Sequence, residues 1–391
     1  MGVMSLASSL SHLVCPECKT EVSADQLQTY CPRCASPWLA SYALAALRLR
    51  LDRDEISRRA PGMWRWAELL PVRSAAHRIT LGEGDTPLLK LERTGARLGL
   101  RRLYLKDEGA NPTGSFKARG MAAAISRAGE LGVRKVIVPT AGNAGGALAA
   151  YAARAGMQAC VVMPQDTPRA NRVECEATGA EVVQVAGLIS DAARIVAQRA
   201  AQEGWFDLST FKEPYRVEGK KVMGYELAEA FAWRLPEVII YPTGGGTGLV
   251  GMAKAFDELE ALGWLEDHRR PRLVAVQAAG CAPVVIAFEH GAVDCEFWEE
   301  AQTIASGLRV PKSFAGRQIL RDIRRTNGAA IAVEDELILA AQSRLAQEEG
   351  VFAAPESAAT LAAAEVLRQR GWLAADETVV CFNTGMGLKY I

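Results

Sequence analysis

The sequence lacks a net charge, because its 45 lysine and arginine residues equal its 45 aspartate and glutamate residues. This balance argues against a polyanionic partner such as nucleic acid. No apolar run reaches the length of a membrane span, and residues 1–14 contain neither lysine nor arginine, unlike a signal peptide. We therefore expect a cytoplasmic protein that binds neither nucleic acid nor a membrane. Its 391 residues suffice for two domains with sizeable cores.

Cysteine is sparse, and four of the nine cysteines form two Cys-Pro-x-Cys pairs separated by 12 residues: Cys15, Cys18, Cys31 and Cys34. Four thiolates in two such pairs predict a tetrahedral structural zinc site. The alternative, disulfides of a secreted protein or unrelated cysteines, is disfavoured by the spacing and by the missing signal peptide. A closed site of four cysteines serves structure or docking rather than catalysis.

One lysine stands where a loop turns into a helix. The run Asn111-Pro112-Thr113-Gly114-Ser115-Phe116-Lys117 begins with turn residues, and the stretch that follows to Leu131 is rich in alanine. Lys117 is therefore expected in the first turn of a helix, near the positive end of its dipole. An ammonium is disfavoured there, which favours the neutral amine that Schiff-base formation requires.

Two further loops predict anion binding. Thr243-Gly244-Gly245-Gly246-Thr247-Gly248 stands between an apolar run and a helix-like stretch, as a phosphate-binding loop does. No Lys-Ser or Lys-Thr follows these glycines, so the loop is not a nucleotide P-loop. Thr140-Ala141-Gly142-Asn143-Ala144 likewise stands between a strand and a helix. A reactive lysine with two anion-binding helix starts favours pyridoxal 5′-phosphate over a nucleotide.

These motifs resemble the fold-type II pyridoxal-phosphate enzymes, the class of the tryptophan synthase β-subunit, and within it threonine synthase most closely. Six ordered segments carry the resemblance: 82–88, 106–120, 140–143, 214–221, 243–248 and 383–389.

The resemblance implies roles for individual residues. Lys117 would form the Schiff base and move protons at Cα and Cβ of the substrate. The side chain of Asn143 would bond the 3′-oxygen of the cofactor, and Thr384 would face its pyridine nitrogen. The cofactor phosphate would be bound by Gly244, Gly245, Gly246, Thr247 and Gly248. The substrate carboxylate would be bound by Thr140, Ala141, Gly142 and Ala144.

Arg216 bears most directly on the substrate. It matches an arginine that binds the substrate phosphate in threonine synthases, and a guanidinium fork suits a phosphate dianion. The resemblance thus implies conversion of O-phospho-L-homoserine and water to L-threonine and phosphate. A surface arginine at a helix start is the structural alternative.

Two residues depart from the threonine synthase pattern. Ala141 replaces a common hydroxyl residue and is more typical of threonine and serine dehydratases, and Ala118 replaces a common aspartate. A threonine or serine ammonia-lyase acting by β-elimination is therefore an alternative. A β-replacement enzyme similar to cysteate synthase, which uses phosphoserine and sulfite, is another. A non-catalytic regulator that recruits partners through the ribbon is disfavoured by the intact Lys117, glycine loop and Thr384.

The order of elements predicts an α/β protein. Short apolar runs alternate with amphipathic helices from residue 130 onward. Among them we expect a strand at Glu181–Val185 and a helix around Asp335–Glu349. We expect two doubly wound α/β domains with the cofactor in the cleft between them, a small N-terminal zinc ribbon, and a homodimer. The predicted segments are a zinc ribbon at 1–40, a helical connector at 41–78 with one helix over Ala43–Arg59, and a catalytic core at 79–391, in which a small domain at about 112–215 is inserted into a large domain formed by 79–111 and 216–391.

Overall fold

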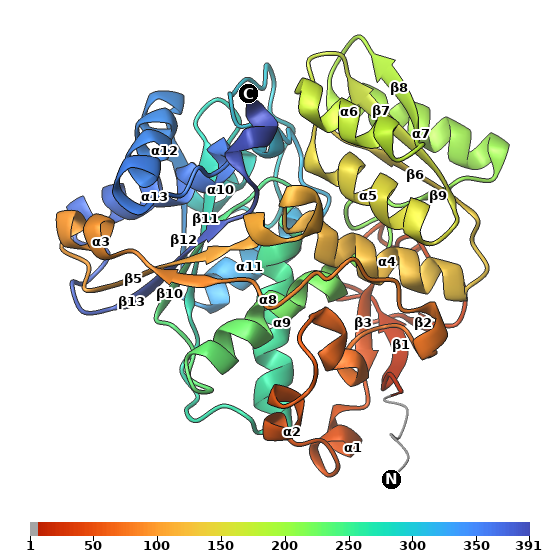
Figure 1. Ribbon diagram of the computed structural model, residues 1–391, viewed down its shortest axis with the longest axis horizontal. Coiled ribbons are helices and arrows are strands. Elements are labelled where there is room, and N and C mark those ends of the chain that lie inside the picture. Colours follow the sequence, from red (N-terminus) through yellow and green to blue (C-terminus); the bar gives the residue numbers. More distant parts are fainter. Residues whose placement is uncertain (1–6) are drawn as a thin grey trace. The chain divides into compact units, whose positions relative to one another are not determined.

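The computed structural model describes residues 7–391, so expectations for residues 1–6 lie outside the described residues. The chain forms two compact units (Figure 1). Unit 1 contains the chain up to Asp85, Lys117–Glu226 and Lys254–Trp264. Unit 2 contains Thr86–Phe116, Leu227–Ala253 and Leu265–Ile391.

Unit 1 is built on two sheets. A three-stranded antiparallel sheet of order β2-β1-β3 carries the four cysteines, and a four-stranded parallel sheet of order β8-β7-β6-β9 forms the main body. Its strands are β1 Leu10–Val14, β2 Glu21–Ser23, β3 Leu39–Tyr42, β6 Lys135–Pro139, β7 Gln158–Pro164, β8 Glu181–Val185 and β9 Phe206–Asp207. Its helices are α1 Leu44–Arg48, α2 Arg53–Ser57, α4 Lys117–Glu130, α5 Asn143–Arg154, α6 Arg169–Ala177 and α7 Ile189–Glu203. Two helices, α8 Arg216–Ala230 and α9 Thr247–Leu262, contribute residues to both units.

The parallel sheet of unit 1 is covered on both faces. The apolar side chains of β7 point alternately to one face and to the other. Cys160 and Val162 pack in one apolar cluster with Ala192 and Val196 of α7. Val161 points to the opposite face, where it contacts the backbone of α5 at Gly145. This two-sided burial is what the continuous apolar strand predicted.

Unit 2 contains a six-stranded sheet of order β12-β11-β10-β13-β5-β4, in which all neighbours are parallel except β4 and β5. Its core lies between these strands and the helices α12 and α13. The strands are β4 Leu88–Lys90, β5 Arg102–Asp107, β10 Val238–Pro242, β11 Arg272–Ala278, β12 Ala329–Val333 and β13 Thr378–Asn383. The helices are α3 Glu92–Leu98, α10 Pro283–Glu289, α11 Gly316–Arg325, α12 Asp335–Glu349 and α13 Pro355–Gln369.

The predicted α/β fold is confirmed, and β8 and α12 have the predicted bounds. The single helix expected over Ala43–Arg59 is wrong. The chain leaves α1 after Arg48, and Asp52 adopts an extended conformation in which its side chain accepts a hydrogen bond from the N–H of Asp54. Asp52 thereby caps a second helix, because a capping side chain satisfies an N–H that the first helical turn leaves unpaired. The described residues contain no helix long and apolar enough to cross a membrane.

Candidate active site

Three loops of unit 2 leave the sheet at the same edge. The strands β10, β13 and β5 are parallel neighbours, so their carboxyl ends lie together. The glycine loop at 243–248 follows β10, Thr384 follows β13, and the segment 108–116 follows β5. In open α/β sheets this edge is where ligands bind. The fold thus brings together, within unit 2, three of the segments singled out in the sequence.

The glycine loop can accept an anion. Gly246 adopts a left-handed conformation with φ of 76°, and a Cβ at Gly244 would lie 2.4 Å from the carbonyl oxygen of Gly307. Only glycine fits these two positions without strain. Within the described residues, no acceptor pairs with the N–H groups of Gly244, Gly245, Gly246, Thr247 and Gly248. Unpaired donors at the start of a 16-residue helix are what a phosphate group requires.

Thr384 is fixed by a serine that the sequence motifs did not indicate. The hydroxyl of Ser357 in α13 accepts a hydrogen bond from the backbone N–H of Thr384 at 2.9 Å. The two hydroxyl oxygens lie 3.5 Å apart. Both side chains are buried, so the Thr384 hydroxyl has a defined position. Ser357 stands in a run of alanines, and no spacing signal distinguishes it from an ordinary helical serine.

The segment that leads to Lys117 is also held within unit 2. The buried carboxylate of Glu108 accepts hydrogen bonds from the Thr86 hydroxyl at 2.6 Å and the Asn111 amide at 2.8 Å. At its end, the N–H of Phe116 donates to the carbonyl oxygen of Thr384 at 3.0 Å. Lys117 is the next residue and the first of α4, as predicted. Its side chain is half-buried.

In unit 1, the predicted carboxylate loop follows β6 and opens α5. Asn143 is the first residue of α5, and the N-cap position belongs to Gly142. The Thr140 hydroxyl accepts a hydrogen bond from the N–H of Gly142 at 3.0 Å, which shapes the turn. The N–H groups of Ala141 and Ala144 have no acceptor among the described residues. These two donors can therefore receive a carboxylate.

Arg216 lies at the same edge of unit 1, because β9 is the parallel neighbour of β6. It opens α8 but is buried, with 1% of its surface exposed, so the interpretation as a surface arginine is wrong. Nη1 donates to the carbonyl oxygen of Leu208 at 2.6 Å. Nε and Nη2 have no hydrogen-bond partner in the described part of the chain. A buried guanidinium with two open donors is costly unless a ligand pairs with it.

Glu213 lies beside this arginine and was not anticipated. Its carboxylate accepts hydrogen bonds from the N–H groups of Tyr215 at 2.9 Å and Arg216 at 2.5 Å, and so caps α8. Burial raises the pKa of Glu213 to about 7, although these N–H groups, Arg216 and Lys220 act in the opposite direction. Burial also lowers the pKa of Arg216, against the opposing effects of Glu213 and Asp207.

The four N-terminal cysteines converge as predicted. Their sulfur atoms all lie within 4.8 Å of one another. The Sγ atoms of Cys15 and Cys34 are 3.4 Å apart, and those of Cys18 and Cys31 are 3.6 Å apart. These distances exceed a disulfide bond of about 2.05 Å. They approach the separation of about 3.8 Å between sulfurs in a tetrahedron with Zn–S bonds of about 2.3 Å. The donor set and its geometry therefore fit zinc.

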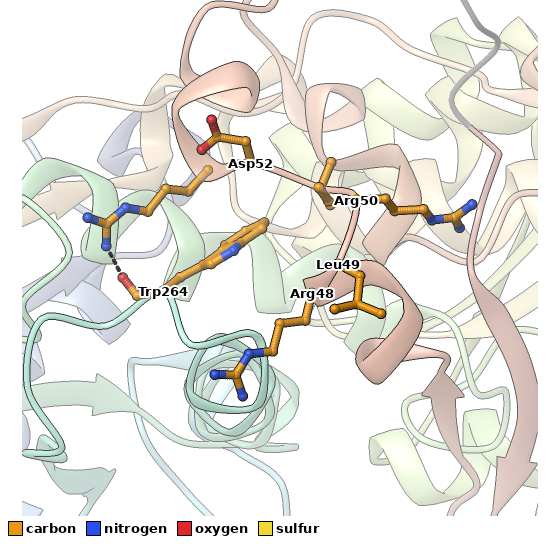
Figure 2. Close-up of a pocket in the computed structure, with 7 residues that line it drawn as sticks. Arg48, Leu49, Arg50, Asp52 and Trp264 are labelled. Atoms are coloured by element: carbon orange, nitrogen blue, oxygen red, sulfur yellow. Dashed lines mark hydrogen bonds between the residues drawn. The ribbon is translucent and has the colours of Figure 1, made fainter.

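A separate hollow of about 430 Å³ lies on unit 1 between α1 and α2 (Figure 2). Arginine side chains line it together with Trp264, whose carbonyl oxygen accepts a hydrogen bond from Arg53. None of the residues predicted for the active site lies in its wall.

Comparison with known proteins identifies the family. Residues 79–385 match the family model described as pyridoxal-phosphate dependent enzyme. A threonine synthase of Methanosarcina acetivorans is 36% identical over 379 residues, which are 97% of this chain and 92% of the relative. A threonine synthase of Methanocaldococcus jannaschii is 34% identical over 376 residues, with 96% and 92% covered.

Solved structures agree on the fold. The crystal structure of a threonine deaminase from T.th. superposes with a TM-score of 0.64 at 26% identity, covering 77% of this chain and 92% of that chain. The matched family model spans the two larger sheets, the loops at 108–116, 140–144 and 243–248, and both Arg216 and Thr384. It does not include the cysteine ribbon or the segment of α1 and α2. This chain therefore belongs to the pyridoxal-phosphate-dependent enzymes of fold-type II, and it is a member of their threonine synthase family.

Proposed function

We propose that this protein is a threonine synthase, which converts O-phospho-L-homoserine and water to L-threonine and inorganic phosphate. The environment of Arg216 is the observation that supports this substrate. Its buried guanidinium leaves Nε and Nη2 without partners among the described residues, and this pair of donors matches a phosphate dianion. A substrate with an uncharged leaving group would leave both donors unpaired.

Other residues of the chain would bind the cofactor and the substrate carboxylate. The N–H groups of the loop at 244–248 would bind the cofactor phosphate, and Asn143 and Thr384 would orient the cofactor ring. The substrate carboxylate would lie on the loop at 140–144. Pyridoxal phosphate, when bound, supplies an electron sink that weakens the bonds at Cα and Cβ of the substrate.

Lys117 would hold the cofactor and then move protons at Cα and Cβ. Phosphate leaves from Cγ, and a water molecule delivers its hydroxyl to Cβ. Arg216 would bind the phosphate until that bond breaks. A hydroxyl opposite the pyridine nitrogen, here Thr384, leaves that nitrogen largely unprotonated, which favours elimination and replacement over transamination.

Ala141 supports the second candidate function, a threonine or serine ammonia-lyase. It leaves the carboxylate loop without the hydroxyl common in threonine synthases. The threonine deaminase with 26% identity has the same fold. In this alternative the substrate hydroxyl leaves from Cβ, and the amino acid becomes a 2-oxo acid and ammonia.

The decisive experiment assays the holoenzyme in parallel with O-phospho-L-homoserine, with L-threonine, and with phosphoserine plus sulfite. We expect threonine and phosphate from the first as the main products. Arg216→Gln is expected to lower kcat/KM for phosphohomoserine by at least about a hundredfold, since two charge-assisted hydrogen bonds are lost. The kcat/KM of Arg216→Lys should lie between those of the unchanged enzyme and Arg216→Gln, because lysine keeps the charge but lacks the forked guanidinium.

Arg269→Gln serves as the matched control, since this arginine is largely exposed and pairs with Asp267. It should leave every rate unchanged. 2-Oxobutanoate from threonine as the main product would overturn the synthase assignment in favour of the ammonia-lyase. Sulfite-dependent consumption of phosphoserine would favour the replacement enzyme.

We also propose that residues 15–34 bind one structural zinc ion, and that the enzyme is a cytoplasmic homodimer with its catalytic core at 79–391. The convergence of four sulfur atoms within 4.8 Å supports the zinc site.

A further inference from the structure

The cysteine ribbon, which is the sheet of β1, β2 and β3 with the four cysteines, contacts the start of α8 on both sides of Arg216. From the ribbon strand β3, the Tyr42 hydroxyl donates to the Glu218 carboxylate at 2.9 Å. On the other side, the Tyr215 hydroxyl donates to the carbonyl oxygen of Ala24, between the two cysteine pairs, at 3.0 Å. Tyr215 directly precedes Arg216, and Glu218 follows it by two residues. The ribbon therefore holds the turn that carries Arg216 through two hydrogen bonds.

These two contacts are shielded from water. The exposed surface is 7% for Tyr42 and 4% for Tyr215, while Ala24 and Glu218 are fully buried. Burial, helped by Glu218, raises the pKa of Tyr42, so its hydroxyl keeps its proton and donates. A buried hydrogen bond to a carboxylate is stronger than one exposed to solvent.

Glu218 cannot follow Tyr42 freely, because two lysines also hold it. Lys221 and Lys254 both lie 2.7 Å from its carboxylate oxygens. Both ammonium groups also lie 3.0 Å from Glu258, which gives a balanced buried cluster of two positive and two negative charges. The carboxylate that receives Tyr42 is thus a fixed point on α8.

The ribbon also touches α4, which begins with Lys117. The guanidinium of Arg127 in α4 donates to the carbonyl oxygen of Ala24 at 2.7 Å and to Asp25 at 2.7 Å. It also lies over the ring of Tyr215, 5.9 Å from the centroid. One short segment of the ribbon therefore connects the helix of Lys117 with the turn of Arg216.

We propose that the ribbon is part of the anion site: Tyr42 and Tyr215 are positioning residues that hold Arg216 at its place on α8. This inference rests on the proposed role of Arg216 as the ligand of the substrate phosphate. It assigns the ribbon a role in substrate selection, beyond stabilising the fold. A phosphorylated substrate would lose affinity when the ribbon contacts are cut, whereas a substrate without phosphate would not.

The test uses the holoenzyme with Tyr42→Phe, Tyr215→Phe and both together, since phenylalanine keeps the ring and removes only the hydroxyl. We expect each single variant to raise KM for phosphohomoserine and the inhibition constant of inorganic phosphate by roughly three- to tenfold. The double variant should exceed either. We expect kcat to change less than about twofold, and the affinity for L-threonine, read from the cofactor spectrum, to stay unchanged.

Tyr30→Phe is the matched control, because Tyr30 belongs to the same ribbon and is 42% exposed. It should leave all four quantities unchanged: KM, the inhibition constant of phosphate, kcat and the affinity for L-threonine. Phosphate and threonine affinities that fall together in the variants would show a merely structural role and overturn the inference, as would an unchanged phosphate affinity.

Arg216→Gln distinguishes a failure of the ribbon inference from a failure of the proposed function. If it weakens phosphate binding while the tyrosine variants do not, the ribbon inference fails and the proposed function stands. If Arg216→Gln leaves phosphate affinity unchanged, the proposed function fails first and the inference falls with it.

Discussion

Lys117, the predicted Schiff-base lysine, stands at a helix start. It is the first residue of α4 and half-buried, where the helix dipole disfavours an ammonium. We expect Lys117→Ala to abolish the visible absorbance of the bound cofactor. It should also lower product formation by at least about a hundredfold, the range for a lost general base. Absorbance spectra of the purified variant and a phosphate-release assay measure the two effects.

Lys90→Ala is the control for this change, because Lys90 is exposed and pairs with a surface glutamate, Glu92. It should keep both the absorbance and the activity. Unchanged absorbance in Lys117→Ala would assign the cofactor to another lysine.

Glu213 is a single residue that should make the stability of the protein depend on pH. Its pKa is raised from 4.5 to about 7, chiefly by burial. Below the lower value the folded and unfolded chains are both protonated, and the contribution to stability is complete. As the pH rises from 4.5 to about 7, the unfolded chain releases the proton first, so this contribution is lost.

Glu213→Gln should remove that loss. We expect its unfolding temperature, relative to the unchanged protein, to rise between about pH 5 and about pH 8. Thermal unfolding across this range measures the difference. Gln198→Ala, at an exposed position of α7 without an ionisable side chain, should give a difference that does not vary with pH. A flat difference for Glu213→Gln would contradict the assignment.

At the scale of elements, α4 and α8 approach each other at glycines. A Cβ at Gly219 would lie 2.0 Å from the carbonyl oxygen of Arg119, a backbone atom that cannot yield easily. The guanidinium of Arg119 in turn pairs with Glu226 of α8 at 2.6 Å, fully buried. We expect Gly219→Ala to destabilise the protein by about 1–3 kcal/mol through overpacking, measured by chemical unfolding.

Gly129→Ala in α4 is the matched control. Its Cβ would meet only the flexible end of Met157. Because alanine favours a helix interior over glycine by about 1 kcal/mol, this variant should be neutral or stabilised. A loss of stability equal to that of Gly219→Ala would show that the close helix contact is not the cause.

The ribbon is an element whose folding should depend on a metal. It is small, and small metal sites of this kind gain folding energy from the ion. We expect elemental analysis to find about one zinc per chain. A strong chelator should lower the unfolding temperature, and added zinc should restore it. A protein purified without metal and insensitive to the chelator would contradict the zinc proposal.

At the scale of the whole molecule, the predicted cofactor ligands are divided between the two units. Lys117 and Asn143 belong to unit 1, whereas the loop at 244–248 and Thr384 belong to unit 2. A ligand that binds the folded chain and not the unfolded one stabilises it, by about 2.7 kcal/mol at a hundred times its dissociation constant. We expect calorimetry to show a higher unfolding temperature with pyridoxal phosphate than without it. An unchanged unfolding temperature would contradict cofactor binding.

Much of this architecture was predictable from local patterns. Strands such as β8 and helices such as α12 were predicted at their bounds because apolar periodicity and caps are local signals. The break between α1 and α2 was missed, since the apolar spacing continues across it and only the cap at Asp52 ends it. Ser357 was missed because a hydrogen bond to the distant backbone of Thr384 follows no sequence period. Glu213 was missed because spacing alone does not show that it is buried and caps α8.

The sequence by itself determined the family, and it predicted the Schiff-base lysine, the glycine loop and the four-cysteine array, because each depends on residue types at short, fixed spacings. Only the tertiary structure decided that Arg216 is buried with open donors, and that the ribbon holds its turn through Tyr42 and Tyr215. Burial and contacts between residues as distant as Tyr42 and Glu218 are set by how helices and strands pack. No local pattern contains that information.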